Sequence, residues 1–318
     1  MAKRKLINEL AWSASRMQTF ERCRRAYYYQ YYGSWEGWYD DAPPDTRKLY
    51  LLKNLTTLPM WAGSIVHETI AGSLMEFART GTAITVGQLQ ARARNCLRGG
   101  WVDAVTKKWV RKPKLTNLQE LYYGNGKTLP KEQTEDCRNR VYGCLQAFAE
   151  SPLLREIQTV PSMDWKPIDK LDSFQVEDVK VWCAIDFSYT APDGTLRILD
   201  WKTGKEKVKT IQTQLACYAL FACERWFATL DKLRIAGVFL GENARVSTYP
   251  IAPELLIDTK EVILRDTVEM RKPLTDVTAN VAREEDFACC EDEWVCQRCS
   301  FREACPAAKD KPFAATPW

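Results

Sequence analysis

The chain has 318 residues, of which 46% are hydrophobic and 27% charged, a balance typical of a globular protein. No apolar run reaches 18 residues and no apolar secretory segment follows the basic residues 3–5, so we expect neither a membrane-spanning helix nor an export signal. The net charge of +4 is too small to indicate or to exclude a nucleic-acid partner. Twelve cysteines without an export signal predict a reducing, cytoplasmic compartment, where cysteine more often binds metal than forms disulfides.

The first half of the chain is predicted to be mainly helical. Aromatic and apolar residues at helical spacing predict a helix from residue 13 to residue 32, with a capping-box pattern at its start in residues 15–18. Residues 33–57 contain two glycines and two prolines before Asp45 and are predicted to form a loop. Pro59 suits the first turn of a second helix that runs to about Arg79. Residues 85–150 are also predicted to be mainly helical, and we interpret them as an inserted helical layer.

The second half alternates strands and helices. Residues 176–189 are rich in β-branched and aromatic side chains and predict a strand, a turn follows at 192–194, and residues 196–201 predict the second strand of a hairpin. A helix over 208–229, strands over 233–240 and 244–250, and a helix over 253–272 follow. The tail from 286 to 318 is rich in cysteine and shows little periodicity.

Two acidic residues mark a candidate metal site on the predicted hairpin. Asp200 and Lys202 point to the same face because side chains alternate along a strand, and Asp186 can face them from the neighbouring strand. Two converging carboxylates suit Mg²⁺ or Mn²⁺, and a nearby lysine can orient a water or stabilise charge on a phosphate. Gln214 and Tyr218 are four residues apart on one face of the next helix, where they can bind a phosphate or hold the lysine. A solvated charge pair and a buried Gln–Tyr pair are the structural alternatives.

His67 is the single histidine of the chain and lies on the second predicted helix. Gly63 precedes it by one turn on the same face, which leaves open space beside the imidazole for a metal or a substrate. An ordinary packed histidine is the alternative interpretation.

These motifs resemble, in their order and approximate spacing, the PD-(D/E)xK nuclease superfamily, RecB-like branch. The resemblance covers roughly residues 12–32, 60–72 and 175–310, and it says little about 80–165. It implies an α/β fold with a restriction-endonuclease-like core, in which a central mixed sheet is flanked by helices. It further implies the following roles: metal ligands His67, Asp186 and Asp200, the catalytic lysine Lys202, and the supporting or DNA-contacting residues Gln214 and Tyr218.

The tail carries a candidate thiol cluster. Cys296 and Cys299 form a Cys-x₂-Cys unit, and Cys305 follows after five residues. The fourth thiolate could come from Cys289, Cys290 or the early Cys23. The pattern with Cys23 resembles the iron staple of AddB-type and CRISPR-associated RecB-like nucleases, which implies a structural [4Fe–4S] cluster held by Cys23, Cys296, Cys299 and Cys305. Zinc in a Cys₄ site and unrelated core thiols are the alternatives.

Basic and aromatic residues alternate around Cys23. Arg22, Arg24 and Arg25 precede a run of tyrosines that includes Tyr28. Arginines mixed with aromatic rings suit single-stranded nucleic acid, in which phosphates pair with the former and bases stack on the latter. In the alternative interpretation, half of these rings belong to the core and the arginines lie on the solvent-exposed face of the helix.

The sequence thus predicts four units: N-terminal helices with the first cluster cysteine and the histidine motif (1–79), a helical insertion (80–165), the nuclease core (166–285) and an iron–sulfur tail that packs on the N-terminal helix (286–318). The predicted function is a metal-dependent DNA nuclease, an exonuclease preferring single strands or ends, in DNA repair, recombination or CRISPR adaptation. The complete phosphate-binding loop Gly-x₄-Gly-Lys-Ser/Thr is absent from the sequence, so a helicase would be a separate partner, as would a recombination or adaptation protein. The alternative is a non-catalytic DNA-binding subunit of a repair or recombination complex, and RNA is a further candidate substrate.

Overall fold

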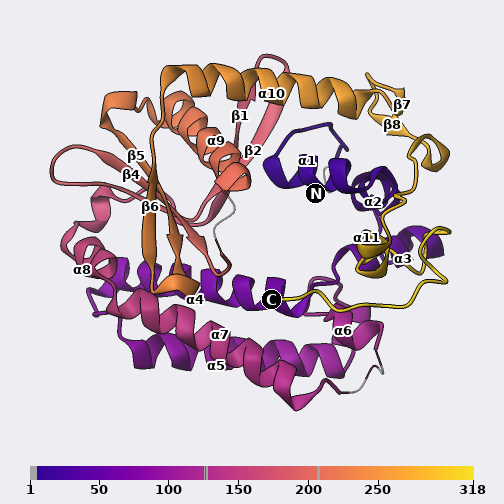
Figure 1. Cartoon of the computed structure of the whole chain (residues 1–318), viewed down its shortest axis with the longest axis horizontal. Helices are drawn as coiled ribbons and strands as arrows, with labels where there is room; N and C mark the ends of the chain where they lie inside the picture. The colour runs from indigo at the N-terminus through magenta and orange to yellow at the C-terminus, as the bar shows by residue number, and fades with distance from the viewer. Residues whose placement is uncertain (1–5, 125, 127, 206–207) are drawn as a thin grey trace, which may run out of the picture.

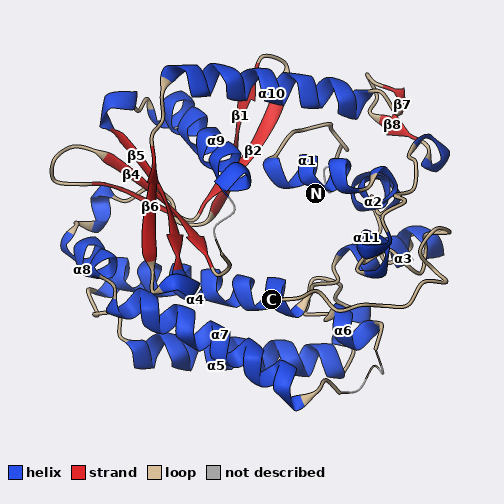
Figure 2. Ribbon diagram, in the orientation of Figure 1, coloured by secondary structure: helices blue, strands red, loops and turns tan. Residues whose placement is uncertain are grey.

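A computed structural model of the chain describes residues 6–124, 126, 128–205 and 208–318. A mixed four-stranded sheet lies between helices, and the N-terminal helices and the C-terminal tail lie together beside it (Figures 1 and 2). The predicted α/β fold, with a central mixed sheet flanked by helices, is therefore confirmed. No helix in the described ranges combines the length and the apolar character that crossing a membrane requires.

The central sheet has the order β3-β4-β5-β6. β3 (Phe187–Thr190) and β4 (Leu196–Lys202) form the predicted antiparallel hairpin. β5 (Leu233–Phe239) runs parallel to β4, and β6 (Arg245–Tyr249) is antiparallel to β5. The long connection between β4 and β5 contains a helix, as a parallel pair requires.

The strand predicted over residues 176–189 is in fact two strands. β2 (Val179–Ile185) pairs with β1 (Lys170–Val176), which the sequence analysis did not predict, whereas β3 pairs with β4. The β1–β2 turn consists of Glu177 and Asp178 and contains neither glycine nor proline, although Glu177 has a φ of +52°. The usual turn signal was therefore missing from this hairpin.

Helices cover both faces of the sheet. α4 (Leu58–Thr80), α5 (Val86–Val105) and α7 (Lys131–Glu150) pack in the core that includes Trp201 and Val238. α9 (Val208–Trp226) and α10 (Pro253–Arg271) pack in the core that includes Ile198 and Ile235. The two sets of strand residues belong to opposite faces because side chains alternate along a strand. α4 is capped by Thr57, whose hydroxyl accepts a hydrogen bond from the amide of Met60, and it carries Pro59 in its first turn as predicted.

The helix predicted over residues 13–32 is interrupted at Cys23. α1 (Ala14–Arg22) ends there, Cys23 is extended with φ −163° and ψ 114°, and α2 (Arg24–Tyr28) follows, continued by a π-helical turn (Tyr29–Gly33). The cap of α1 is Ser13, whose hydroxyl accepts from the amide of Arg16, so the capping box expected at residue 15 is wrong. The Cys23 thiol accepts a hydrogen bond from the amide of Ala26 at 3.4 Å and so caps α2 in turn.

Three more helices complete the first half. α3 (Pro44–Lys53) lies inside the segment predicted as a loop, where Pro44 in its first turn and the burial of Leu49, Tyr50 and Leu52 explain its formation. α6 (Gln119–Tyr122) is short, and α8 (Pro152–Thr159) follows α7 after Ser151.

The C-terminal segment packs on the N-terminal helices. It contains the small hairpin β7 (Leu274–Asp276) and β8 (Val281–Ala282), the short helix α11 (Glu293–Gln297) and several turns. Phe301 and Ala308 share a buried cluster with Ala26 and Leu52. The amide of Arg25 donates to the carbonyl of Ala288 at 3.0 Å.

Candidate active site

His67 projects from the middle of α4 toward the sheet. Its Nδ1 atom lies 3.1 Å from Oδ1 of Asp186, 119 residues away in the chain, and 32% of its side chain is exposed. A Cβ at Gly63, one turn earlier, would lie 3.4 Å from Oγ1 of Thr203, which is ordinary contact. The glycine therefore faces the loop that follows Lys202, and the imidazole faces a carboxylate.

Asp186 occupies the single residue between β2 and β3, not a strand as expected. Phe187 pairs with Leu199, so Asp186 lies across from Asp200 at the end of the hairpin. Its Oδ2 atom accepts a hydrogen bond from the amide of Trp201 at 2.7 Å. One carboxylate oxygen is thus held by the backbone of β4, while the other faces His67.

Asp200 is 1% exposed and contacts two side chains directly. Its Oδ2 atom forms an ion pair with Nζ of Lys202 at 2.6 Å, and its Oδ1 atom lies 3.1 Å from the hydroxyl of Tyr218. Nζ of Lys202 also donates to Oε1 of Gln214 at 2.9 Å, and Nε2 of Gln214 donates to the hydroxyl of Tyr218 at 2.7 Å. The structure thus brings Lys202, Gln214 and Tyr218 into one network around Asp200.

Electrostatics distinguish Asp200 from an ordinary carboxylate. Burial, followed by the charge of Asp186, raises the pKa of Asp200 to about 6, although Lys202 and His67 oppose the shift. Burial alone would lower the pKa of His67, but the charges of Asp186 and Asp200 outweigh it, so the pKa of His67 is raised. Burial and the charge of Asp200 likewise raise the pKa of Tyr218, which keeps its hydroxyl protonated.

Two residues near the site escaped the sequence analysis. The amide of Asp169 donates to the carbonyl of Asp186 at 3.2 Å, and burial and the charge of Asp186 raise the pKa of the Asp169 carboxyl. Arg140 on α7 donates from Nη2 to the carbonyl of Thr203 at 2.8 Å and so holds the loop after Lys202. Asp169 lies just before β1, a strand that the sequence did not predict. Arg140 lies in residues 80–165, about which the family resemblance says little. No local sequence pattern therefore marked either residue as part of the site.

The residues of this site fit a hard divalent cation by their chemistry. Two carboxylates and an imidazole converge, and the repulsion that raises the pKa of Asp200 is the kind that a bound cation relieves. In the conformation described, however, no three His, Cys, Asp or Glu side chains of the described residues are grouped closely enough to hold a metal ion. Instead, His67 contacts Asp186, and Lys202 contacts Asp200.

Six cysteines gather where the tail meets α2. Cys23, Cys290, Cys296, Cys299 and Cys305 line one small cavity. The sulfur of Cys289 lies 3.9 Å from the sulfur of Cys305. All four cysteines of the predicted cluster therefore line the same cavity together with Cys290, and Cys289 lies beside Cys305. Burial raises the pKa of Cys299 to about 12 and that of Cys305 to about 11, so both are neutral thiols when nothing is bound.

The four predicted nucleic-acid contacts have different environments. Arg22 is exposed, and the guanidinium of Arg24 lies 3.6 Å from the ring centroid of Phe20. Arg25 is committed to the protein, because it forms an ion pair with Glu284 at 2.6 Å and donates to the carbonyl of Phe287 at 2.8 Å. Tyr28 is partly exposed and packs at 5.4 Å, between ring centroids, on Phe287. Of the neighbouring rings, Tyr27 and Tyr29 belong to the core.

Comparison with known proteins identifies a family that fits this geometry. No curated protein matches the sequence. The sequence profile of the PD-(D/E)XK nuclease superfamily, in contrast, matches residues 11–306, which include His67, Asp186, Asp200, Lys202 and all six clustered cysteines. The chain belongs to the PD-(D/E)XK nuclease superfamily.

Proposed function

We propose that this protein is a metal-dependent deoxyribonuclease of the RecB-like branch. We further propose that it is an exonuclease that prefers single strands or DNA ends and acts in DNA repair, recombination or CRISPR adaptation. The observation that carries the proposal is the juxtaposition of two pairs, His67 with Asp186 at 3.1 Å and Lys202 with Asp200 at 2.6 Å. The amide of Trp201, next to Asp200, joins them because it donates to Asp186 at 2.7 Å. A helicase or a recombination or adaptation protein is the expected partner, because the chain has no phosphate-binding motor loop.

His67, Asp186 and Asp200 would hold Mg²⁺ or Mn²⁺. When bound, the ion would polarise the phosphodiester and lower the pKa of a water molecule. The backbone amide of Trp201 fixes the orientation of Asp186. Tyr218 fixes that of Asp200 through its hydroxyl.

Lys202 is the residue proposed to act on the scissile phosphate. The Lys202 side chain is 31% exposed, and Asp200 and Gln214 hold its amine. The amine therefore lies at the edge of the buried network, with access to substrate. A fixed ammonium at this place orients a nucleophilic water and stabilises the negative charge that develops on the phosphate. Gln214 is a positioning residue in this scheme, since it joins Lys202 to Tyr218.

The cysteines are proposed to bind a structural [4Fe–4S] cluster through Cys23, Cys296, Cys299 and Cys305. The fit rests on the cavity that these four thiols share and on the soft character of thiolate ligands, which suits iron–sulfur clusters and zinc. A cluster there would join α2 to the tail. Visible absorption of anaerobically purified protein tests the assignment, because an iron–sulfur protein is brown, whereas a colourless sample that contains zinc contradicts it.

A cleavage assay tests the function itself. Labelled single-stranded DNA, double-stranded DNA and single-stranded RNA are incubated with the protein in Mn²⁺ and in chelator. We expect the wild type to remove nucleotides from single-stranded DNA or DNA ends only when metal is present. We expect the Asp200→Asn variant to remove none. Asp178→Asn is the matched control, because Asp178 shares the Asp-x-Lys pattern but is 67% exposed and pairs with Arg271. DNA binding without cleavage under all conditions would instead identify a non-catalytic binding subunit.

A further inference from the structure

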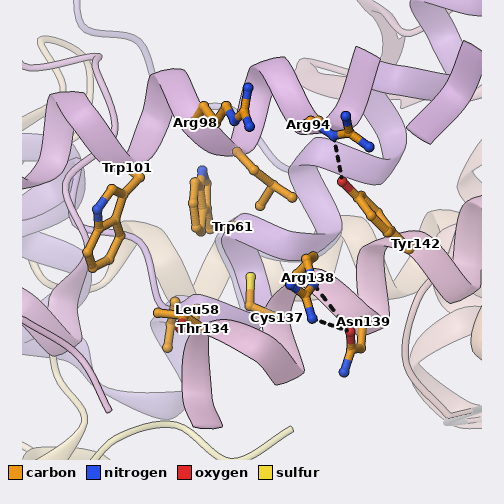
Figure 3. A pocket seen from close by; sticks show the side chains of 11 residues that line it. Leu58, Trp61, Arg94, Arg98, Trp101, Thr134, Cys137, Arg138, Asn139 and Tyr142 are labelled. Carbon is orange, nitrogen blue, oxygen red and sulfur yellow. Dashed lines mark hydrogen bonds between the residues drawn. The ribbon is translucent and has the colours of Figure 1, made fainter. Parts of the chain in front are cut away.

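A second site lies in the helical layer, on another face of α4 from His67. A cavity of about 830 Å³ opens between α4, α5 and α7 (Figure 3). This volume is within the range of pockets that bind small organic ligands. Trp61 in its floor precedes His67 by six residues, which places it about 9 Å along the helix axis and about 120° around it. The cavity and the candidate active site are therefore distinct.

Helical spacing directs the lining side chains into this cavity. Arg94, Arg98 and Trp101 follow one another at intervals of four and three residues, so they share one face of α5. Arg138 and Tyr142 are four residues apart on α7 and share the face opposite. In Figure 3 these side chains surround the indole of Trp61. Two helices thus present three guanidinium groups and two aromatic rings to the same space.

The floor is aromatic and rigid. Trp61 is 8% exposed, and a Cβ at residue 100 would lie 2.9 Å from its ring, so only Gly100 allows the indole to lie this close to α5. Cys137, 2% exposed, completes the floor from α7. The indole is thereby packed in place as the floor, and the partly exposed Trp101 is the tryptophan ring on which a ligand can stack.

The charges of the cavity are uncompensated. Arg94, Arg98 and Arg138 are exposed, and within the described part of the chain no carboxylate lies at ion-pair distance from any of them. Arg94 donates a hydrogen bond to the hydroxyl of Tyr142 at 3.5 Å, and Arg138 donates one to the Asn139 side chain at 3.3 Å. By contrast, Arg92 on the same helix forms an ion pair with Glu76. Three guanidinium groups without counter-charges around one cavity favour a phosphate, which arginine binds through paired N–H donors.

We propose that this cavity binds a nucleoside phosphate, with the base on Trp101 over the floor that Trp61 forms and the phosphate among Arg94, Arg98 and Arg138. The ligand is either a free nucleotide or one nucleotide unit of a single strand, since both present the same base and phosphate. The inference does not require the proposed nuclease activity. It adds a binding function to the helical layer, the part of the chain for which the sequence analysis predicted no role.

Calorimetric titration of the full chain in chelator tests this proposal with four probes: thymidylate, thymidine, single-stranded oligothymidylate and polyglutamate. We expect saturable binding of oligothymidylate, and Arg94→Glu/Arg98→Glu should weaken it by about tenfold or more. Arg111→Glu/Lys112→Glu, two exposed positions outside the cavity, is the matched control for the change of charge and should leave affinity within about twofold. Trp101→Ala should weaken binding by about tenfold, and Trp101→Phe should restore most of it.

The probes also separate the two sources of ligand. Binding of thymidylate as well as oligothymidylate identifies a free-nucleotide site, whereas binding of oligothymidylate alone identifies a strand-binding site. The titration in chelator measures binding and not cleavage, so failure of the proposed nuclease function leaves this result unchanged. The proposal is overturned if neither nucleotide probe binds, if thymidine or polyglutamate binds as tightly, or if the control variant weakens binding as much as the arginine variant.

Discussion

Replacing Asp200 with asparagine is expected to make the metal-free protein more stable while it removes nuclease activity. Asparagine keeps the shape of the side chain and can still accept the hydrogen bond from Tyr218, but it carries no charge. The pKa of Asp200 is raised to about 6 from its ordinary 3.8 by burial and by Asp186. At about 1.4 kcal/mol for each tenfold change in proton affinity, the ionised carboxylate costs the folded protein about 3 kcal/mol.

The sign of the pH dependence follows from the same shift. Because the folded protein binds the Asp200 proton more tightly than the unfolded chain does, the free energy of unfolding falls as pH rises from about 4 through about 6. His67 acts in the same direction, since its pKa is raised and its stabilising protonation is lost as pH rises through that value. The gain from Asp200→Asn should therefore approach about 3 kcal/mol near pH 8 and vanish near pH 4.

Urea denaturation followed by circular dichroism, in chelator at both pH values, measures this gain. Asp178→Asn is the control, because Arg271 lowers the pKa of the exposed Asp178 carboxyl, and removal of that charge should not stabilise the protein. Added Mn²⁺ should stabilise the wild type more than Asp200→Asn. If Asp200→Asn is less stable than the wild type near pH 8, or if its gain is equal at both pH values, the electrostatic account of the site is wrong.

Three further substitutions address the rest of the network and the thiols. Lys202→Gln should slow DNA cleavage by about a hundredfold or more, and an unchanged single-turnover rate would contradict its role at the phosphate. Tyr218→Phe removes the hydroxyl that accepts from the Gln214 amide and that the Ala184 carbonyl and the Asp200 carboxylate share as donor, so urea denaturation should show a loss of about 1–3 kcal/mol. Cys23→Ser should lose the visible absorption and iron content of the purified protein and unfold at a lower temperature, and full retention of iron would exclude Cys23 as a ligand.

The part of the site that local spacing could predict is the part built on β4 and α9. Alternation along a strand places Asp200 and Lys202 on one face, and a separation of four residues places Gln214 and Tyr218 on one helix face. These four side chains meet in the structure. The contact between His67 and Asp186 has no such local basis, since the two residues lie 119 positions apart, and only the family resemblance connected them.

The features that sequence could not predict depend on tertiary contacts. A continuous helix and a helix interrupted at Cys23 have the same spacing of apolar residues. Two hydrogen bonds stabilise the interruption: the amide of Ala26 donates to the Cys23 thiol, and the amide of Arg25 donates to the carbonyl of Ala288 in the tail. The carbonyl of Thr203 is held by Arg140 from a helix that approaches β4 only in the folded protein. Short-range patterns contain no information about such partners.

The backbone at Asp186 connects two parts of the molecule that are each held by other contacts. The β1–β2 hairpin is fixed on one side to the N-terminal segment, where the amides of Trp12 and Trp182 donate to the carbonyls of Lys180 and Trp12. On the other side, one residue joins it to the central sheet, and that residue carries a carboxylate beside His67. Because Val181 and Ile185 of this hairpin are also buried in the core with α9 and α10, the backbone from which Asp186 projects is held on both sides.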